Sequence, residues 1–91
     1  MGIKRFHLII SGRVQGVSYR MSAWEKARQL GLSGWVRNLN DGRVEMIIEG
    51  DSSLLEQMTD WAGQGPRFAS VTNVDVSEEK VSGDLEDFEI R

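Results

Sequence analysis

Ten of the 91 residues are glycine, against roughly 7% in an average protein, and they divide the chain into short segments. Glycine adopts turn conformations that other residues avoid, so glycines between apolar runs predict frequent changes of direction. No apolar run is longer than that of Leu8-Ile9-Ile10, which is far below the roughly 20 residues of a membrane-spanning helix. We therefore expect one small domain of short elements over residues 1–91.

The apolar periodicity of each segment predicts its type, because strands alternate every two residues and helices repeat every three or four. Strands are predicted over residues 4–11, 34–40, 43–49 and 71–77, with a candidate short strand within 85–90. Helices are predicted over residues 20–30 and from about residue 53 to residue 62. This β-α-β-β-α-β order is typical of a ferredoxin-like α+β sandwich. We expect an antiparallel sheet of four strands, plus the candidate C-terminal strand, with two helices on one face.

Side-chain alternation also predicts which residues face the helices. In the first strand Phe6, Leu8 and Ile10 share one side, and in the closing strand Phe88 and Ile90 are expected to point inward. These residues are the candidate core of the sheet.

Turn and cap signals mark the ends of the elements. Residues Asn40-Asp41-Gly42 predict a tight hairpin, because Asp-Gly tolerates the positive φ of such turns. Ser53 followed by Glu56 resembles a capping box for the second helix, and Asp51 is the alternative cap. The helices are expected to end at glycines, namely Gly31 for the first and Gly63 and Gly65 for the second.

Composition and charge limit the kinds of functional site that the chain can form. The chain has no cysteine and one histidine, which excludes disulfides, thiolate catalysis and multi-histidine metal sites. The net charge of −3 divides into +6 for residues 1–43 and −9 for residues 44–91. A basic half could hold an anion site, or folding could interleave the two halves into a mixed surface.

The segment SGRVQGVSYR, residues 11–20, joins the first strand to the first helix through a loop bounded by Gly12 and Gly16. Such a loop points successive backbone N–H groups into one concavity, where backbone can approach an anion closely. Arg20, at the helix start, could close over the same anion with its planar fork. The segment is neither a Walker A loop nor a G-x-G-x-x-G motif. It also fits an ordinary strand-to-helix turn with an exposed arginine.

Asn38 lies on the second strand with the parity of Val36. An amide on an otherwise apolar face needs partners, and it can both donate to and accept from a water molecule. A hydrogen-bonded asparagine near a hairpin end is the alternative interpretation.

Together, GRVQGVSYR at 12–20 and GWVRNLNDGRVE at 34–45 resemble the two signatures of the acylphosphatase family. The resemblance continues through Glu49-Gly50, Gly65-Pro66, residues 69–71 and the closing residues 88–91, so it covers essentially the whole chain. Two departures are slight: Tyr19 stands where phenylalanine is more usual, and Ser18 occupies a variable position.

The resemblance implies a metal-free and cofactor-free enzyme that hydrolyses acyl phosphates to a carboxylate and inorganic phosphate. It implies that Arg20 binds the phosphate and Asn38 positions the attacking water. The amides of Gln15, Gly16, Val17, Ser18 and Tyr19 would complete the phosphate cradle. Phosphoryl transfer needs mainly positioning and charge stabilisation. The carboxylate leaving group is weakly basic, so a general acid is unnecessary. The proton acceptor is not evident, and a substrate phosphate oxygen is our hypothesis.

Other residues give weaker signals. His7 is expected to be a surface or hydrogen-bonded histidine, Ser11 and Ser18 have no nearby base, and the three tryptophans are expected to pack. The acidic residues within 78–89 do not have the spacing of an EF-hand loop.

Two rival functions use the same fold. The sequence does not support an RNA-recognition module, because it contains no RNP1-type motif. The expected open face of the sheet also carries Glu45 and Glu49 in place of aromatic residues that could stack on bases. The other rival is an inactive or regulatory domain, including the acylphosphatase-like domains of larger carbamoyl-transfer maturation enzymes. We expect a free-standing cytoplasmic monomer whose partner is a small acyl phosphate, with no nucleic acid and no membrane.

Overall fold

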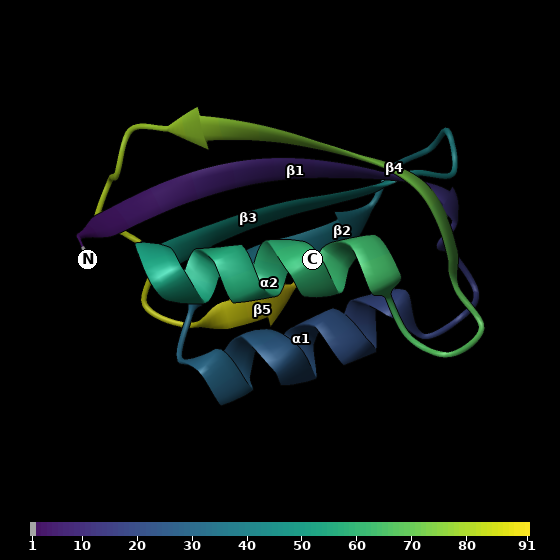
Figure 1. The fold of residues 1–91 in the computed structure, drawn as a ribbon, viewed down its shortest axis with the longest axis horizontal. Coiled ribbons are helices and arrows are strands. Elements are labelled where there is room, and N and C mark those ends of the chain that lie inside the picture. The colour runs from purple at the N-terminus through teal and green to yellow at the C-terminus, as the bar shows by residue number, and fades with distance from the viewer. Residues whose placement is uncertain (1) are drawn as a thin grey trace.

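The computed structural model describes residues 2–91, and its elements follow the predicted order (Figure 1). Met1, which the predicted domain includes, lies outside the described residues. The elements are β1 (Ile3–Arg13), α1 (Tyr19–Leu30), β2 (Ser33–Asn38), β3 (Val44–Asp51), α2 (Ser52–Gln64), β4 (Ser70–Glu79) and β5 (Phe88–Ile90). None of the helices in this described part is both long and apolar enough to cross a membrane.

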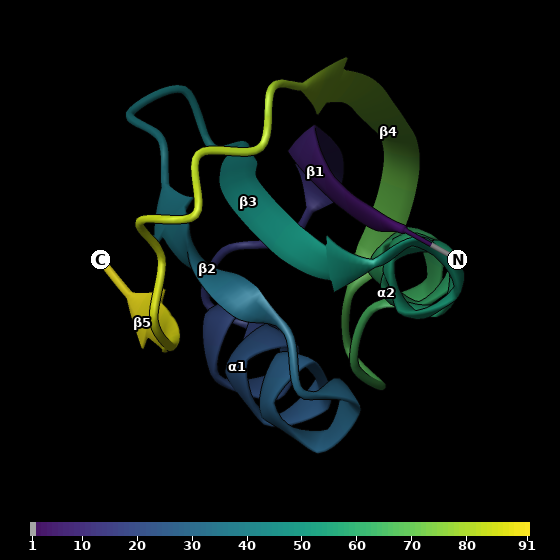
Figure 2. The same cartoon turned by 90° about the vertical axis from the view of Figure 1, so that its left-hand side faces the viewer.

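The strands form one sheet in the order β4-β1-β3-β2-β5. The four long strands pair antiparallel, as predicted, whereas β5 pairs parallel to β2, with Gly34 opposite Phe88 and Val36 opposite Ile90. The chain leaves β4 at one edge and crosses at one end of the sheet to the opposite edge (Figure 2). It therefore returns in the direction opposite to β4, which is the direction of β2. The sheet is thus mixed.

Both helices cover one face of the sheet, which confirms the predicted sandwich (Figures 1 and 2). The core lies between them and is built from alternating strand residues and one stripe of each helix. Its fully buried members include Leu8, Ile10, Ala23, Ala27, Val36, Met46, Ile48, Leu55, Met58 and Ala62. Phe6 packs against this cluster while partly exposed.

The helix ends follow the predicted chemistry with two corrections. Gly31 caps α1 in the left-handed conformation, as expected. Asp51 caps α2 by accepting a hydrogen bond from Ser53 N. The alternative cap, Asp51, is therefore the one observed, in place of the capping box of Ser53 and Glu56. Helix α2 also continues through Gly63 and ends at Gly65, because an exposed glycine weakens a helix without breaking it.

The hairpin between β2 and β3 is one residue longer than a tight two-residue turn. Leu39 N donates to Arg43 O at 2.8 Å, and Gly42 N donates to Leu39 O at 3.3 Å. Only Gly42 in this loop has a positive φ, of 95°, which is typical of a three-residue loop. The glycine acts as predicted, and the hairpin leaves Asn38 at the end of β2.

Strand β1 continues through Gly12 and Arg13, which sequence reasoning assigned to the loop. The register against β4 shifts between Ser11 and Gly12, which marks a bulge. Gly12 has φ +121°, and a Cβ atom there would lie 2.2 Å from the Ser70 backbone oxygen. The close approach that requires glycine is therefore to β4, whereas at Gly16 a Cβ atom would meet nothing within 4 Å.

Candidate active site

The loop between β1 and α1 presents a run of unused backbone donors. The N–H groups from Gln15 to Met21 donate to no carbonyl or side chain among residues 2–91. Gly16 and Ser18 both have positive φ, of 75° and 63°, and Ser18 makes no side-chain cap to the helix. The first turn of α1 contains no acidic residue. Free N–H groups at the positive end of a helix dipole form a binding surface for an anion.

Arg20 adds a cation to this surface. It is the second residue of α1, is partly buried, and makes no ion pair or hydrogen bond with the other described residues. By contrast, five arginines each lie within 4 Å of a carboxylate oxygen, namely Arg5, Arg28, Arg37, Arg43 and Arg91. A partly buried guanidinium without an anion is a ready partner for a phosphate.

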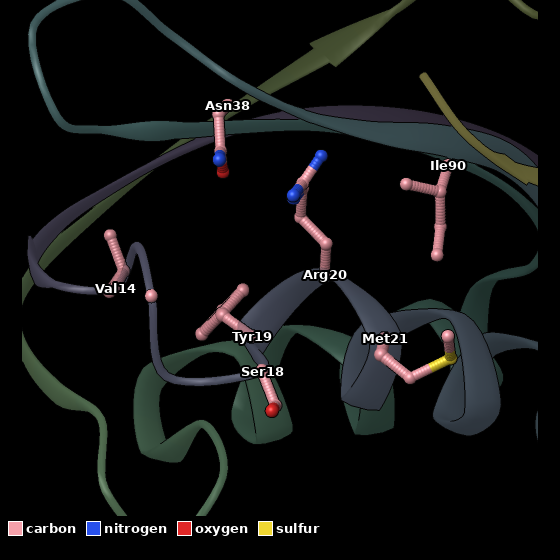
Figure 3. A pocket seen from close by; sticks show the side chains of 8 residues that line it. Val14, Ser18, Tyr19, Arg20, Met21, Asn38 and Ile90 are labelled. Atoms are coloured by element: carbon pink, nitrogen blue, oxygen red, sulfur yellow. The ribbon is translucent and has the colours of Figure 1, made fainter.

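Asn38 faces this arginine from the last position of β2. It lies on the helix-covered side of the sheet, with the parity of Val36. Its Oδ1 atom is buried and has no hydrogen-bond partner among residues 2–91. An unsatisfied buried acceptor costs about 1–3 kcal/mol, so this oxygen is suited to accept a hydrogen bond from a water molecule or a ligand. Figure 3 shows the Asn38 amide and the Arg20 guanidinium directed into the same space.

That space is a cavity of about 330 Å³, which is large enough for a water molecule and a phosphate group. Of the residues predicted for the site, five line it: Gly16, Ser18, Tyr19, Arg20 and Asn38. Gln15 and Val17 do not, and the Val17 side chain packs against the core. The predicted catalytic pair is thus brought together, and the flanking loop residues contribute backbone to the site.

The Gln15 side chain has a positioning role that sequence reasoning missed. Its Nε2 atom donates to Leu39 O at 2.8 Å and to Arg43 O at 2.9 Å. These two carbonyls belong to the hairpin that follows Asn38. One side chain therefore holds the donor loop against the element that carries the asparagine. The acceptors are backbone carbonyls, which every residue carries, so the sequence signals this contact only through the long amide side chain of Gln15.

Tyr19 anchors the start of α1 to α2. Its phenol donates to Ala62 O at 2.7 Å, and its ring centroid lies 5.3 Å from that of Trp61. Burial raises the pKa of this phenol, so it stays neutral. The hydroxyl, absent from the phenylalanine more usual in the family, finds a backbone acceptor.

Three apolar residues that sequence reasoning did not assign to the site also line the cavity, namely Val14, Met21 and Ile90. Ile90 was predicted to point inward with Phe88, and this is wrong in part, because Phe88 is buried but Ile90 is 39% exposed. It shares the side of β5 with Phe88, yet it lies beside the open cavity.

The other side chains considered from the sequence take no part in the cavity chemistry. His7 Nε2 lies 2.7 Å from Glu45 Oε2 on the open face of the sheet, which confirms a hydrogen-bonded histidine. Burial acts to raise the pKa of Glu45, but hydrogen bonds from His7 and Arg37 outweigh it and the net pKa is lowered. The Ser18 hydroxyl points away from Arg20 and Asn38 (Figure 3). Within residues 2–91, no three His, Cys, Asp or Glu side chains cluster as metal ligands would.

The open face differs from the expectation in one respect. It carries Glu45 and Glu49 as predicted, but Trp35 lies on it as well, with the Arg37 and Arg91 guanidinium groups 5.1 and 5.3 Å from its ring centroid. Glu49 is buried beneath the segment that joins β4 to β5, where Ser82 N donates to it. The single aromatic is thus already covered by protein cations.

A sequence profile of the acylphosphatase family matches residues 6–90. The chain belongs to the acylphosphatase family. It is 54% identical over 86 residues to an acylphosphatase of Thermococcus kodakarensis, covering 94% of this chain and 93% of that protein. It is 50% identical over 88 residues to an acylphosphatase of Methylococcus capsulatus, covering 97% and 96%. Both similarities extend over nearly the full length, so the chain is an enzyme of the acylphosphatase class, a hydrolase.

Solved acylphosphatases have the same fold. The structure of the Coxiella burnetii acylphosphatase superposes with a TM-score of 0.94 at 40% identity, covering 98% of this chain and 93% of that chain. Full-length HypF matches with a TM-score of 0.86 at 24% identity, and the match takes up 12% of its chain. The acylphosphatase fold therefore also occurs within much longer proteins.

Proposed function

We propose that the chain hydrolyses acyl phosphates to a carboxylate and inorganic phosphate by direct attack of water, without a metal ion. The observation that carries the proposal is the convergence on one cavity of the Arg20 guanidinium and Asn38 Oδ1, neither of which has a partner among residues 2–91. Membership of the acylphosphatase family supports the same reaction.

The phosphate would bind where the unused donors meet Arg20. Backbone N–H groups of residues 15–21 and the guanidinium fork would hold its oxygens, while the first helical turn adds a favourable dipole. Phosphoryl transfer places charge on the three equatorial oxygens in the transition state. Donors already aimed at those oxygens stabilise that charge without reorganisation.

The attacking water would be held by Asn38. Its buried Oδ1 can accept a hydrogen bond from the water, which satisfies the acceptor and aims the oxygen lone pair at phosphorus. Asparagine does not take up a proton at neutral pH. We therefore assign the proton to an oxygen of the substrate phosphate. The P–O bond to the acyl group then breaks, and the carboxylate leaves with the electron pair.

Residues of β2, β5, α1 and the preceding loop of one chain line the cavity, which supports the proposal that the protein acts as a monomer. Size-exclusion chromatography with light scattering would test this state. The cytoplasmic location expected above stays a prediction.

The deciding experiment measures loss of benzoyl phosphate at neutral pH in the presence of EDTA. The wild-type chain should turn over, and Arg20→Ala and Asn38→Ala should each lower kcat/KM by about 10²–10³-fold, the usual effect of losing one preorganised donor. Arg20→Lys should also be impaired, because lysine keeps the charge but lacks the planar fork.

Arg28→Ala is the matched control. Arg28 lies on the same helix but is exposed, outside the cavity, and paired with Asp87. It should retain wild-type turnover. Absence of turnover in the wild type, full activity of the Arg20 and Asn38 variants, or a requirement for added Mg²⁺ would each refute the proposed mechanism.

A further inference from the structure

The cavity has an apolar side that the phosphate and the water do not use. Met21 is 52% exposed and Ile90 is 39% exposed, and both line the cavity beside Arg20. Figure 3 shows these two side chains on the side of Arg20 that lies away from Asn38 and Val14. Large apolar side chains left open to solvent next to a binding cation indicate a surface for an apolar group.

Two separate elements hold this surface in place. Met21 follows Arg20 in the first turn of α1. Ile90 is held by β5, where Arg91 N donates to Val36 O at 2.8 Å and the neighbouring Phe88 is buried. The two side chains line the same cavity because β5 adds to the edge of the sheet next to β2.

The direction of the reaction assigns a substrate group to this surface. In phosphoryl transfer the attacking and leaving oxygens lie roughly in line on opposite sides of phosphorus. With the water at Asn38, the leaving carboxylate lies on the far side of the phosphate, away from that residue. The side chains of Met21 and Ile90 form the part of the cavity wall on the side of Arg20 that lies away from Asn38.

The charge of the cavity narrows the kind of acyl group. Among residues 2–91, Arg20 is the only charged side chain that lines the cavity, and the phosphate would neutralise that charge. A second anionic group on the acyl part would therefore find no cation, whereas an aromatic or branched alkyl group would contact apolar side chains.

Resting on the proposed function, we infer that Met21 and Ile90 contact the acyl group and set specificity. They favour acyl phosphates with a neutral, apolar acyl part, such as benzoyl phosphate, over acetyl phosphate. The acyl part of acetyl phosphate is a single methyl group, which covers little of this wall.

The test compares kcat/KM for benzoyl phosphate and acetyl phosphate in the wild type, Met21→Gln and Ile90→Thr. Glutamine keeps the length and helix preference of methionine, and threonine keeps a β-branched side chain on the strand. Each variant should lower the benzoyl-to-acetyl ratio by about three- to tenfold. This lies below the usual range for enclosed pockets, about 10–200-fold per methylene, because both side chains are partly exposed. The intrinsic reactivity of each substrate cancels in this comparison.

Two controls separate specificity from damage. Val76→Thr makes the Ile90-type change at an exposed valine of β4 outside the cavity, and it should leave the ratio unchanged. Inhibition by inorganic phosphate should be the same in all four proteins, because phosphate does not reach the apolar wall. Weaker phosphate inhibition in the Met21 or Ile90 variant would overturn the inference, since it would place these residues at the phosphate.

Failure of the acyl contact and failure of the proposed function give different results. If the wild type hydrolyses both substrates and neither variant changes the ratio, the acyl contact is wrong while the proposed function stands. If the wild type hydrolyses neither substrate, the proposed function fails, and this inference fails with it.

Discussion

Asn38 is expected to lower the stability of the fold while it supports the reaction. Its Oδ1 atom is buried on the helix-covered side of the sheet without a hydrogen-bond partner among residues 2–91. Replacement by leucine, Asn38→Leu, keeps a side chain of similar size and removes the unsatisfied acceptor. This variant should therefore be more stable than the wild type and nearly inactive.

The expected magnitudes follow from the environment of the amide. A fully unsatisfied buried acceptor costs about 1–3 kcal/mol. Because the cavity has room for a water molecule that can satisfy part of this demand, we take the lower end, about 1 kcal/mol. In a domain of this size that gain raises Tm by about 4–8 °C. Loss of the water-positioning group should lower kcat/KM by about 10²–10³-fold, or roughly 2.7–4 kcal/mol.

Urea unfolding followed by tryptophan fluorescence gives the stability, and hydrolysis of benzoyl phosphate gives the activity. Asn73→Leu is the control, because Asn73 is exposed on β4 and its amide is already solvated; its stability should change by less than about 0.5 kcal/mol. The reasoning is refuted if Asn38→Leu is less stable than the wild type, or if it keeps more than about a tenth of the wild-type kcat/KM.

Three further predictions concern the frame of the site and the sheet. Gln15→Met removes both bonds to the hairpin carbonyls; it should cost about 1–2 kcal/mol in urea unfolding and weaken inhibition by phosphate, and an unchanged inhibition constant would contradict the positioning role. Gly12→Ala forces a Cβ atom against Ser70 O at a positive φ and should cost about 3 kcal/mol or more. Gly16→Ala meets no atom within 4 Å and should cost only about 1–2 kcal/mol; equal losses in urea unfolding would refute this contrast. The pKa of Glu45 is lower in the folded chain than in the unfolded chain, so the unfolded chain binds a proton on this carboxylate more readily. The ionised carboxylate therefore stabilises the fold above its usual pKa of about 4.3. This stabilisation is lost as pH falls through the lower pKa of the folded state. In Glu45→Gln the free energy of unfolding should fall less steeply as the pH is lowered. The same slope in the variant and the wild type would contradict this prediction.

Much of the architecture could be read from local patterns. Period-two and period-three-to-four apolar repeats placed the long strands and both helices within a few residues of their observed ends, because these patterns reflect side-chain direction within one element. The turns predicted at Gly31 and Gly42 are also confirmed, since both residues have a positive φ. This backbone conformation depends on the local sequence alone. The residues proposed for the reaction, Arg20 and Asn38, came from motif resemblance, and their roles stay predictions.

The sequence missed features that depend on contacts between distant segments. The bonds of Gln15 link positions 24 and 28 residues apart, and no local pattern encodes such a distance. The capping box predicted at Ser53 does not form for a local reason. The Ser53 N–H group donates to the Asp51 side chain, which lies two residues earlier. Gly12 was interpreted as room for an anion, whereas its close neighbour is the backbone of β4.

By itself, the sequence determined the order of the elements and the residue types available for chemistry. Each of these is set by the backbone preferences and side-chain periodicity of a short segment. Only the tertiary structure decided that β5 runs parallel to β2, that Asn38 Oδ1 is buried with no partner in the described part of the chain, and that Ile90 and Met21 both line the cavity beside Arg20. These features depend on strand order and on the crossing of residues 80–87 between opposite edges of the sheet. Side chains far apart in the chain become neighbours only when the whole sheet has formed.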